Sequence, residues 1–487
     1  MSFRFAYGRP PAVAAEAMVA TSQPLATRAG LRMLERGGNA ADAALAAAAV
    51  LSVTEPMSTG AGGDAFAVVS AGDAIEGLDA AGPAPGRADP LVPVEQRGPR
   101  SVTVPGAVAG WVTLADRHGR LGLEACLADA IDTAERGFAV GSRTAAAWAA
   151  TSGTSASWAT ARVPPELSPP PARGTRRRMP DLATTLRAIA RDGARVFYEG
   201  PVAEAICAVS WLEPDDLAGF EPRWVEPLRL RYRGYDVLEM PPPTQGVAAL
   251  EALGLLEGLT PDLPNQIDSV RLALEDARER VRDGADVRDL LVPDFLDQRR
   301  PQTAATVSGP RGGTVYLCAV DRDRMAVSFI QSLFGSFGSG LVAPGTGVVL
   351  QNRGGCFAVQ GEVVPGKRPY HTIIPGMLLR NGDLVGPFGV MGGFIQAQAH
   401  VQLVSALVDD GLDPQAALER PRFWVDGELV RLEEGLWERA AELERLGYQV
   451  TRDDDTFGFG GGQAIVVDGD ALLGGSDPRK DGYAAGL

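Results

Sequence analysis

The stretch Gly312-Gly313-Thr314-Val315-Tyr316-Leu317-Cys318-Ala319-Val320-Asp321 places a threonine directly after two glycines, at the first residue of a period-two strand. Glycines leave the carbonyl before the threonine without side-chain cover and permit strained backbone angles there. A hydroxyl just after such a carbonyl can attack it and move the acyl group from nitrogen to oxygen. Hydrolysis of that ester would release Thr314 as a new N-terminus. The sequence therefore predicts a cleavage site between Gly313 and Thr314.

A threonine at a new N-terminus carries its own base. An α-amino group titrates at about 7.7–8.0, whereas a lysine side chain titrates at about 10.4. This pairing of hydroxyl and amine is typical of N-terminal nucleophile hydrolases. The polar segment 301–313 suits a linker that is cut and then moves away. The simpler alternative is that Thr314 only opens a strand.

Length and composition set the scale of the fold. A chain of 487 residues with 45% hydrophobic residues can bury a large core. This length allows about two to four domains, or one large α/β unit. The formal net charge of −15 argues against a nucleic-acid partner and against binding to anionic membrane surfaces.

Neither a targeting segment nor a metal site is indicated. The first residues, MSFRFAYGRPPAV, lack an apolar core of signal-peptide length. The apolar stretch 40–53 is too short to span a bilayer, and its alanine content favours a buried helix. We therefore expect a cytoplasmic protein. No disulfide framework, zinc site or other metal centre is expected, because there are three histidines and no CxxC spacing among Cys126, Cys207, Cys318 and Cys356.

Hydrophobic periodicity and turn signals predict alternating helices and strands. Helices are expected at 24–36, at 40–51 with Asn39 as the cap, twice within 101–137, and at 180–192, 200–208, 246–258, 268–283 and 397–409. Strands are expected at 65–70, in a hairpin of 314–320 and 325–332, near Val430 and at 464–467. The stretch 152–178 indicates a mobile surface loop, and glycine-rich loops are expected between the hairpin and 397–409. The pattern predicts one α/β domain in which two sheets lie between helices.

The chain resembles the γ-glutamyltransferase family of N-terminal nucleophile hydrolases nearly end to end. The resemblance rests on separated motifs in the family's order: Met18-Val-Ala-Thr-Ser-Gln-Pro-Leu25, Gly37-Gly-Asn-Ala-Ala-Asp42, Glu55-Pro-Met-Ser-Thr-Gly-Ala-Gly-Gly63, Val104-Pro-Gly-Ala-Val-Ala-Gly-Trp111, Pro242-Pro-Thr-Gln-Gly246 and the segment 314–333. It implies a four-layer αββα sandwich, autocleavage before the nucleophile, and a heterodimer of fragments 1–313 and 314–487. Hydrolysis by a threonine nucleophile needs no metal or organic cofactor.

The catalytic positions of the family are matched. Thr314 stands at the position of the nucleophile, and Ser332 stands where a supporting threonine is usual, eighteen residues further on. Gly392 and Gly393 match the glycine pair whose backbone N–H groups would hold the developing oxyanion. The simpler readings are a solvated strand-end serine and a tight glycine turn.

The positions that would bind a γ-glutamyl group depart from the family pattern. The arginine expected for the α-carboxylate is missing from 78–85, and only Arg87 lies close. Phe334 replaces an expected asparagine, and Arg353-Gly-Gly-Cys356, after Asn352, replaces an acid pair. Tyr370-His371 replaces a serine pair. The candidate substrate-binding residues are therefore Arg87, Phe334, Asn352, Arg353, Tyr370 and His371, and each also has a purely structural reading.

These features predict a self-processing amidase or acyl hydrolase whose acyl group carries a carboxylate but no adjacent amine. Its substrate would be a small molecule such as an oxamate-like amide or the side-chain amide of a β-lactam. Three alternatives remain open: γ-glutamyl hydrolysis or transfer, carbon–carbon bond hydrolysis in secondary metabolism, and a non-catalytic homologue that acts as a binding subunit.

Overall fold

Strand β10 (Gly313–Val320) is buried along its whole length, and its side chains alternate between two hydrophobic layers. Val315, Leu317 and Ala319 pack in one cluster with helices of the N-terminal half. Tyr316 and Cys318 pack in a second cluster, which contains strands of another sheet. A strand buried on both faces needs a layer on each side. The hairpin predicted from the sequence is confirmed, with β11 (Ala326–Phe334) as its second strand.

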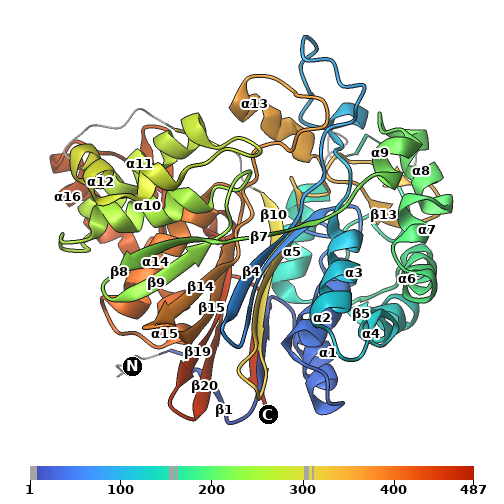
Figure 1. Cartoon of the computed structure of the whole chain (residues 1–487), viewed down its shortest axis with the longest axis horizontal. Helices are drawn as coiled ribbons and strands as arrows, with labels where there is room; N and C mark the ends of the chain where they lie inside the picture. The colour runs from blue at the N-terminus through green and yellow to red at the C-terminus, as the bar shows by residue number, and fades with distance from the viewer. Residues whose placement is uncertain (1–7, 153–157, 160–162, 301–306, 310–311) are drawn as a thin grey trace.

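The computed structural model describes residues 8–152, 158–159, 163–300, 307–309 and 312–487. Two seven-stranded antiparallel sheets face each other (Figure 1). The β10 sheet runs in the order β21 (Tyr483–Gly486), β2 (Met18–Thr21), β10, β11, β3 (Asp64–Ala71), β4 (Ala74–Ala80) and β7 (Arg223–Val225). The β15 sheet runs in the order β1 (Ala12–Ala14), β20 (Ala471–Ser476), β19 (Gly461–Asp468), β15 (Asp383–Met391), β14 (Gly376–Arg380), β9 (Tyr235–Glu239) and β8 (Leu228–Tyr232).

Helices cover both outer faces and complete the predicted four-layer αββα sandwich. The β10 sheet is covered by α1 (Pro24–Glu35), α2 (Ala40–Thr54), α3 (Ala107–His118), α4 (Leu123–Arg136), α5 (Ser142–Ser152), α6 (Pro180–Asp192), α7 (Arg195–Tyr198), α8 (Pro201–Val209) and α9 (Pro214–Ala218). The β15 sheet is covered by α10 (Gly246–Leu256), α11 (Leu263–Arg280), α12 (Pro293–Arg299), α14 (Ile395–Val408), α15 (Pro414–Glu419) and α16 (Ala440–Arg445). The smaller sheets are formed by β5 (Phe138–Ala139) with β6 (Arg176–Arg177), β12 (Val342–Ala343) with β13 (Val348–Val349), and β16 (Phe423–Asp426), β17 (Leu429–Leu432) and β18 (Gln449–Arg452).

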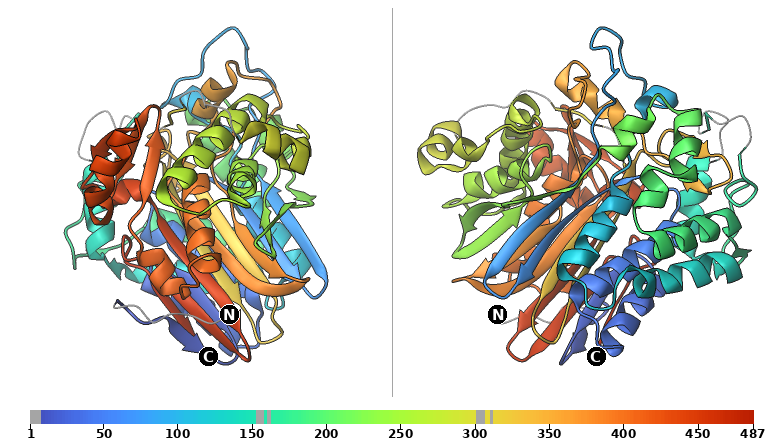
Figure 2. Two further views of the ribbon diagram at one scale, coloured as in Figure 1. Left: turned by 90° about the vertical axis from the view of Figure 1, so that its left-hand side faces the viewer. Right: turned by 45° about the vertical axis from the view of Figure 1, so that its right-hand side comes forward.

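The two ends of the described chain lie together at one edge of the sandwich (Figure 2). Strand β2 pairs with β21, and β1 pairs with β20. The Leu487 N–H donates to the Ala17 carbonyl at 2.8 Å. Each sheet therefore combines strands from both sides of the Gly313–Thr314 bond.

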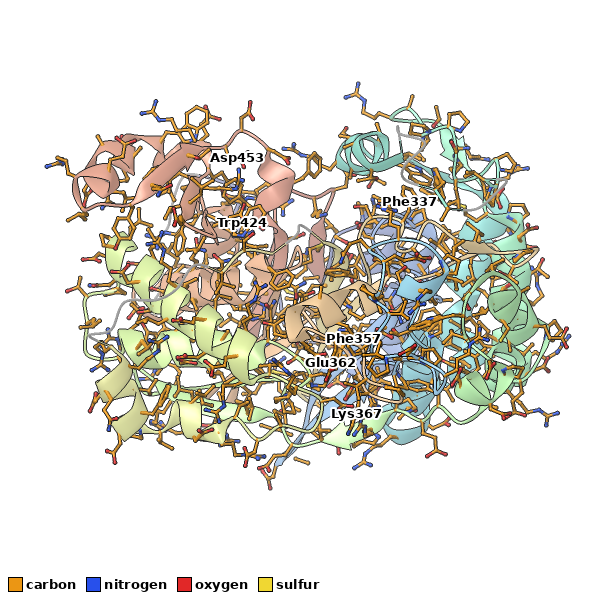
Figure 3. The ribbon with its side chains drawn as sticks, turned by 90° about the horizontal axis from the view of Figure 1, so that it is seen from above. Phe337, Phe357, Glu362, Lys367, Trp424 and Asp453 are labelled. Carbon is orange, nitrogen blue, oxygen red and sulfur yellow. The ribbon has the colours of Figure 1, made fainter. Side chains whose placement is uncertain are left out.

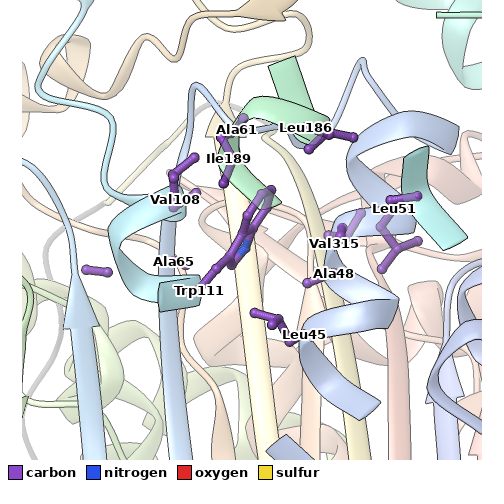
Figure 4. Packing of buried hydrophobic residues seen from close by; sticks show 14 of the residues in the cluster. Leu45, Ala48, Leu51, Ala61, Ala65, Val108, Trp111, Leu186, Ile189 and Val315 are labelled. Atoms are coloured by element: carbon purple, nitrogen blue, oxygen red, sulfur yellow. The ribbon is translucent and has the colours of Figure 1, made fainter. Parts of the chain in front are cut away.

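Helix α2 is the buried, alanine-rich helix that the sequence predicts, and every one of its residues is buried. Asn39 caps it, with Oδ1 accepting from the Ala41 and Asp42 N–H groups at 3.1 and 3.2 Å. Small side chains let α2 lie close to β10 and β11. Trp111 packs in the hydrophobic layer beside α2 (Figure 4). Its indole donates to Gln331 Oε1 at 3.0 Å. This bond satisfies a buried polar pair in the layer behind Thr314.

The glycine-rich loops predicted before residue 397 are wrong in part, because 376–380 and 383–391 form β14 and β15. A Cβ on Gly389 would lie 2.4 Å from the Tyr316 ring of the facing sheet. Here the glycine lets a large aromatic side chain approach the strand. Helix α5 is not predicted from the sequence either. Much of the predicted linker and part of the predicted mobile loop lie outside the described residues.

None of the helices in the described ranges combines the length and the apolar character needed to cross a membrane.

Candidate active site

The pairing of β10, β11 and β3 places Thr314, Ser332 and Asp64 in one row across three strands. Ser332 lies opposite Thr314, and Asp64 lies opposite Ser332. Directly opposed residues have Cβ atoms about 4.5–5.5 Å apart. All three follow the alternation that puts Tyr316 and Phe66 between the sheets. The row therefore lies at the end of the inter-sheet core.

The Ser332 hydroxyl joins the candidate nucleophile to the carbonyl that it would attack. Ser332 Oγ donates to the Gly313 carbonyl at 2.7 Å and lies 3.1 Å from Thr314 Oγ1. A serine has one hydroxyl proton, and a carbonyl can only accept. Thr314 must therefore be the donor to Ser332. The Phe334 N–H also donates to Ser332 Oγ, at 2.8 Å.

A β-bulge interrupts the hairpin at the predicted cleavage site. The register shifts between Gly313, which pairs with Phe334, and Thr314, which pairs with Ser332. Leu333 is left out of the ladder, and its N–H donates to Ser58 while its carbonyl accepts from the Asn352 N–H. Phe334 has a φ of 72°, in the left-handed region that non-glycine residues rarely adopt. Backbone strain therefore lies directly opposite the predicted cleavage site.

The glycine pair between β15 and α14 lies against Gly312, the residue before Gly313. The Gly312 N–H donates to the Gly392 carbonyl at 3.4 Å. Gly392 and Gly393 have φ values of 135° and 78°. Gln245, which the sequence reading did not single out, donates to the Gly393 carbonyl at 3.2 Å and to the Thr372 carbonyl at 2.8 Å. A buried side chain thus fixes the candidate oxyanion loop.

Arg353 lies on the far side of Ser332 and is fully buried. Its guanidinium donates to Thr372 Oγ1 at 3.0 Å, lies 3.5 Å from Ser332 Oγ and packs 4.4 Å from the centre of the Phe334 ring. No described carboxylate lies within 4.0 Å of it, and its Nε has no hydrogen-bond partner there. Seen from above, Phe357 of the following α13 (Phe357–Gln360) lies over the middle of the molecule, with Glu362 and Lys367 nearby (Figure 3).

Asp64 and His371 complete this buried polar cluster. Asp64 Oδ1 accepts from the Gly82 and Gly106 N–H groups, both at 3.2 Å, and from Gln351 Nε2 at 3.0 Å. Its Oδ2 lies 3.1 Å from His371 Nε2, without the angle that a hydrogen bond requires. Burial raises the pKa of Asp64 to about 7, although Arg353 opposes this change. Burial and Arg353 lower the pKa of His371 well below its usual value.

The remaining predicted binding residues have mainly structural contacts in this form of the chain. Tyr370 stacks on Phe394 with centroids 5.8 Å apart, and its hydroxyl donates to Gln245 at 3.4 Å. Asn352 Oδ1 accepts from the Gly335 N–H at 2.7 Å and so holds the turn after the bulge. The structure does not bring Arg87 to the site. That side chain is 49% exposed and binds the Trp211 carbonyl and Glu213 instead.

The sequence reading missed Asp64, although a signal for it exists. Asp64 directly follows the glycine run 60–63 and shares the parity of Phe66 and Val68, which face inward. An acid at an inward strand position indicates a special role, because buried carboxylates are rare unless they are paired. Within the described residues, no three His, Cys, Asp or Glu side chains gather as metal ligands would.

Comparison with known proteins identifies the family of the chain. Residues 26–487 match the family model for gamma-glutamyltranspeptidase. The chain is 33% identical to the glutathione hydrolase-like YwrD proenzyme of Bacillus subtilis, over 96% of this chain and 98% of that protein. It is 34% identical to the oxamate amidohydrolase proenzyme of Klebsiella pneumoniae, over 97% and 99%. The structure of a cephalosporin acylase from Bacillus halodurans matches with a TM-score of 0.92 and 40% identity, over 100% of this chain and 98% of that one. The chain therefore belongs to the γ-glutamyltranspeptidase family and has the fold of its N-terminal nucleophile hydrolases.

Proposed function

We propose that the protein is a self-processing hydrolase of amide bonds that uses Thr314 as its nucleophile. The family is one of γ-glutamyltranspeptidase-type hydrolases, and two of the relatives named above are proenzymes. The observation that carries the proposal is the hydrogen-bonded series from Thr314 Oγ1 through Ser332 Oγ to the Gly313 carbonyl. A strand with only a structural role does not need these hydroxyls beside a strained bulge.

In the proposed processing step, Thr314 Oγ1 attacks the Gly313 carbonyl carbon. The Thr314 proton passes to Ser332 Oγ, and the Ser332 proton passes to the carbonyl oxygen, so charge balances. Collapse of the tetrahedral intermediate breaks the Gly313–Thr314 C–N bond, leaves an ester on Oγ1 and gives the freed amine its proton. Water then cleaves the ester. The products are the fragments 1–313 and 314–487, which stay together because both sheets contain strands from each.

In the proposed turnover, the new Thr314 amine accepts the hydroxyl proton while Oγ1 attacks the substrate carbonyl. The N–H groups of Gly392 and Gly393 stabilise the oxyanion, and Gln245 keeps that loop in place. The amine returns its proton to the leaving group. Water resolves the acyl-enzyme, and no cofactor takes part.

We propose that the acyl group of the substrate carries a carboxylate but no α-amine. Arg353 is buried beside Ser332 with no described acid within 4.0 Å, and such a charge is costly unless an anion pairs with it. Oxamate, which gives one relative its name, is an amide of this kind. The test is kcat/KM on the processed enzyme for oxalyl and glutaryl amides beside γ-glutamyl-p-nitroanilide. A clear preference for the γ-glutamyl compound would refute this assignment.

A second candidate, hydrolysis of γ-glutamyl amides, is favoured by one observation. Asp64 supplies a buried acid 3.1 Å from His371 Nε2, in the same cluster as Arg353, and an ionised Asp64 would pair with a substrate ammonium. The same kinetic comparison separates the two candidates.

A further inference from the structure

The cluster of Asp64, Arg353 and His371 contains more unpaired polar atoms than a structural core needs. Asp64 Oδ2, Arg353 Nε and both ring nitrogens of His371 have no hydrogen-bond partner in the described chain. All three side chains are fully buried, and each unmet group of this kind costs free energy. Asp64 Oδ1, by contrast, is held by three donors. One oxygen of Asp64 is therefore fixed to the fold, while the other lies 3.1 Å from His371 Nε2 without a hydrogen bond and keeps its hydrogen-bonding capacity for a ligand.

We propose that Asp64 is a specificity-determining residue that binds the acyl carboxylate in its protonated form, donating from Oδ2 beside the Arg353 guanidinium. This inference rests on the proposed function. Asp64 shares the cross-strand row of Thr314 and Ser332, so it lies two strands from the nucleophile. An acyl group of glutaryl length attached to Thr314 would extend along this row toward Asp64 and Arg353.

The protonation state of Asp64 would then decide whether an acyl group that carries a carboxylate can bind. Burial raises the Asp64 pKa to about 7, so the carboxyl is a donor below neutrality and an anion above it. The titratable groups that face it are Arg353, His371, Cys356 and Tyr198. Burial lowers the His371 pKa and raises the pKa values of Cys356 and Tyr198, which keeps these three neutral near pH 7. Arg353 remains the cation, and an ionised Asp64 would repel a substrate carboxylate.

The experiment compares glutaryl-p-nitroanilide with its monomethyl ester on the processed enzyme between about pH 5.5 and 8.5. The Thr314 amine is the base for both substrates, so the effect of its titration cancels in the ratio of the two kcat/KM values. We expect the ratio to fall by up to about tenfold per pH unit above pH 7, because one proton is lost. A ratio that does not change with pH in the wild type would overturn the inference.

Asp64→Asn is the sharpest variant, because its amide oxygen can keep the Oδ1 contacts while its NH2 group is a permanent donor at Oδ2. The ratio in Asp64→Asn should stay high and flat across the pH range. Asp79→Asn is the matched control, since Asp79 is also buried with a pKa of about 7 but lies on β4 beside Arg368. This control should keep the wild-type fall.

A fall that survives in Asp64→Asn would assign the titration to another group and overturn the inference. A substrate series that shows no preference for the carboxylate at any pH, in wild type and Asp64→Asn alike, would instead refute the proposed function.

Discussion

The two halves of the candidate site are built in different ways. Around Thr314, hydroxyls and backbone groups satisfy one another, and the register of one hairpin sets their positions. Around Arg353, polar side chains from β3, the turn after Asn352 and the loop before β14 meet, and several of their polar atoms have no hydrogen-bond partner among the described residues. The nucleophile half, which consists of Gly313, Thr314 and Ser332, is therefore positioned by one hairpin, and its hydrogen bonds form without a substrate. The acyl half, which consists of Asp64, Arg353 and His371, is assembled from segments that are distant in the sequence. Substitutions there could therefore change the preference for an acyl group while Thr314 stays in place.

The largest expected effect tests the nucleophile half. Thr314→Ala should leave a single chain of 51.0 kDa, because no hydroxyl remains to attack the Gly313 carbonyl. Intact mass should show two fragments for the wild type, the smaller beginning at Thr314. Thr314→Ser keeps the hydroxyl and should still be cut. Efficient cleavage in Thr314→Ala would refute the assignment, and an uncut wild type after long incubation would support a non-catalytic binding subunit.

The next effect tests the acyl half alone. Arg353→Ala should lower kcat/KM for a carboxylate-bearing acyl amide by about 10- to 150-fold, since a hydrogen bond to a charged group contributes about 1.5–3 kcal/mol. The monomethyl ester substrate should lose far less. Processing should continue in this variant, because Arg353 only reaches Ser332 at 3.5 Å. Equal losses on both substrates would mean that Arg353 merely supports the fold.

A smaller effect is expected where the two halves meet. Ser332→Ala removes the group between Thr314 and the Gly313 carbonyl, and the loss of one neutral hydrogen bond costs about 0.5–1.5 kcal/mol. Processing, measured as the rate of appearance of the 314–487 fragment, should slow several-fold. Ser332→Thr restores a hydroxyl and should process close to the wild-type rate. Wild-type rates in Ser332→Ala would leave the residue with a structural role only.

The smallest effect is expected for Arg87, which lies outside the acyl half. Arg87→Ala should change kcat/KM for every acyl substrate by less than about threefold, because the side chain is half exposed and pairs with Glu213 at the surface. Exposed ion pairs of this kind contribute about 0–1 kcal/mol. A selective loss with carboxylate substrates would extend the acyl half to Arg87 and revise its position in the active form.

The difference between the halves also explains what the sequence could predict. Period-two alternation and a turn at 321–324 predict the hairpin, and the eighteen-residue spacing of Thr314 and Ser332 follows from its register. The helices follow from apolar spacing and from caps such as Asn39. The sequence does not predict strands β14 and β15, because glycines usually interrupt strands. Here Gly389 makes room for the Tyr316 ring, a reason that only the facing sheet reveals.

The acyl half was predictable only as a set of departures from the family pattern. Arg353 and His371 could be singled out, but Asp64, which lies in the same buried cluster, is 287 residues from Gln351, one of its hydrogen-bond partners. No local pattern links residues so far apart. Phe334 contributes to this half through its ring, whose centre lies 4.4 Å from the Arg353 guanidinium and which accepts the cation on its face.

The interleaving of strands from both sides of residue 313 has a thermodynamic consequence. In the β10 sheet, β10 and β11 lie between β2 and β3, and in the β15 sheet four strands of the C-terminal part lie between β1 and β9. Once the bond is cut, unfolding becomes a dissociation, and its midpoint depends on protein concentration as it does for an obligate dimer. The uncut precursor unfolds as one molecule and has no such dependence. Folding must therefore precede the cut, since two separated fragments would each have to form sheets with their central or flanking strands missing.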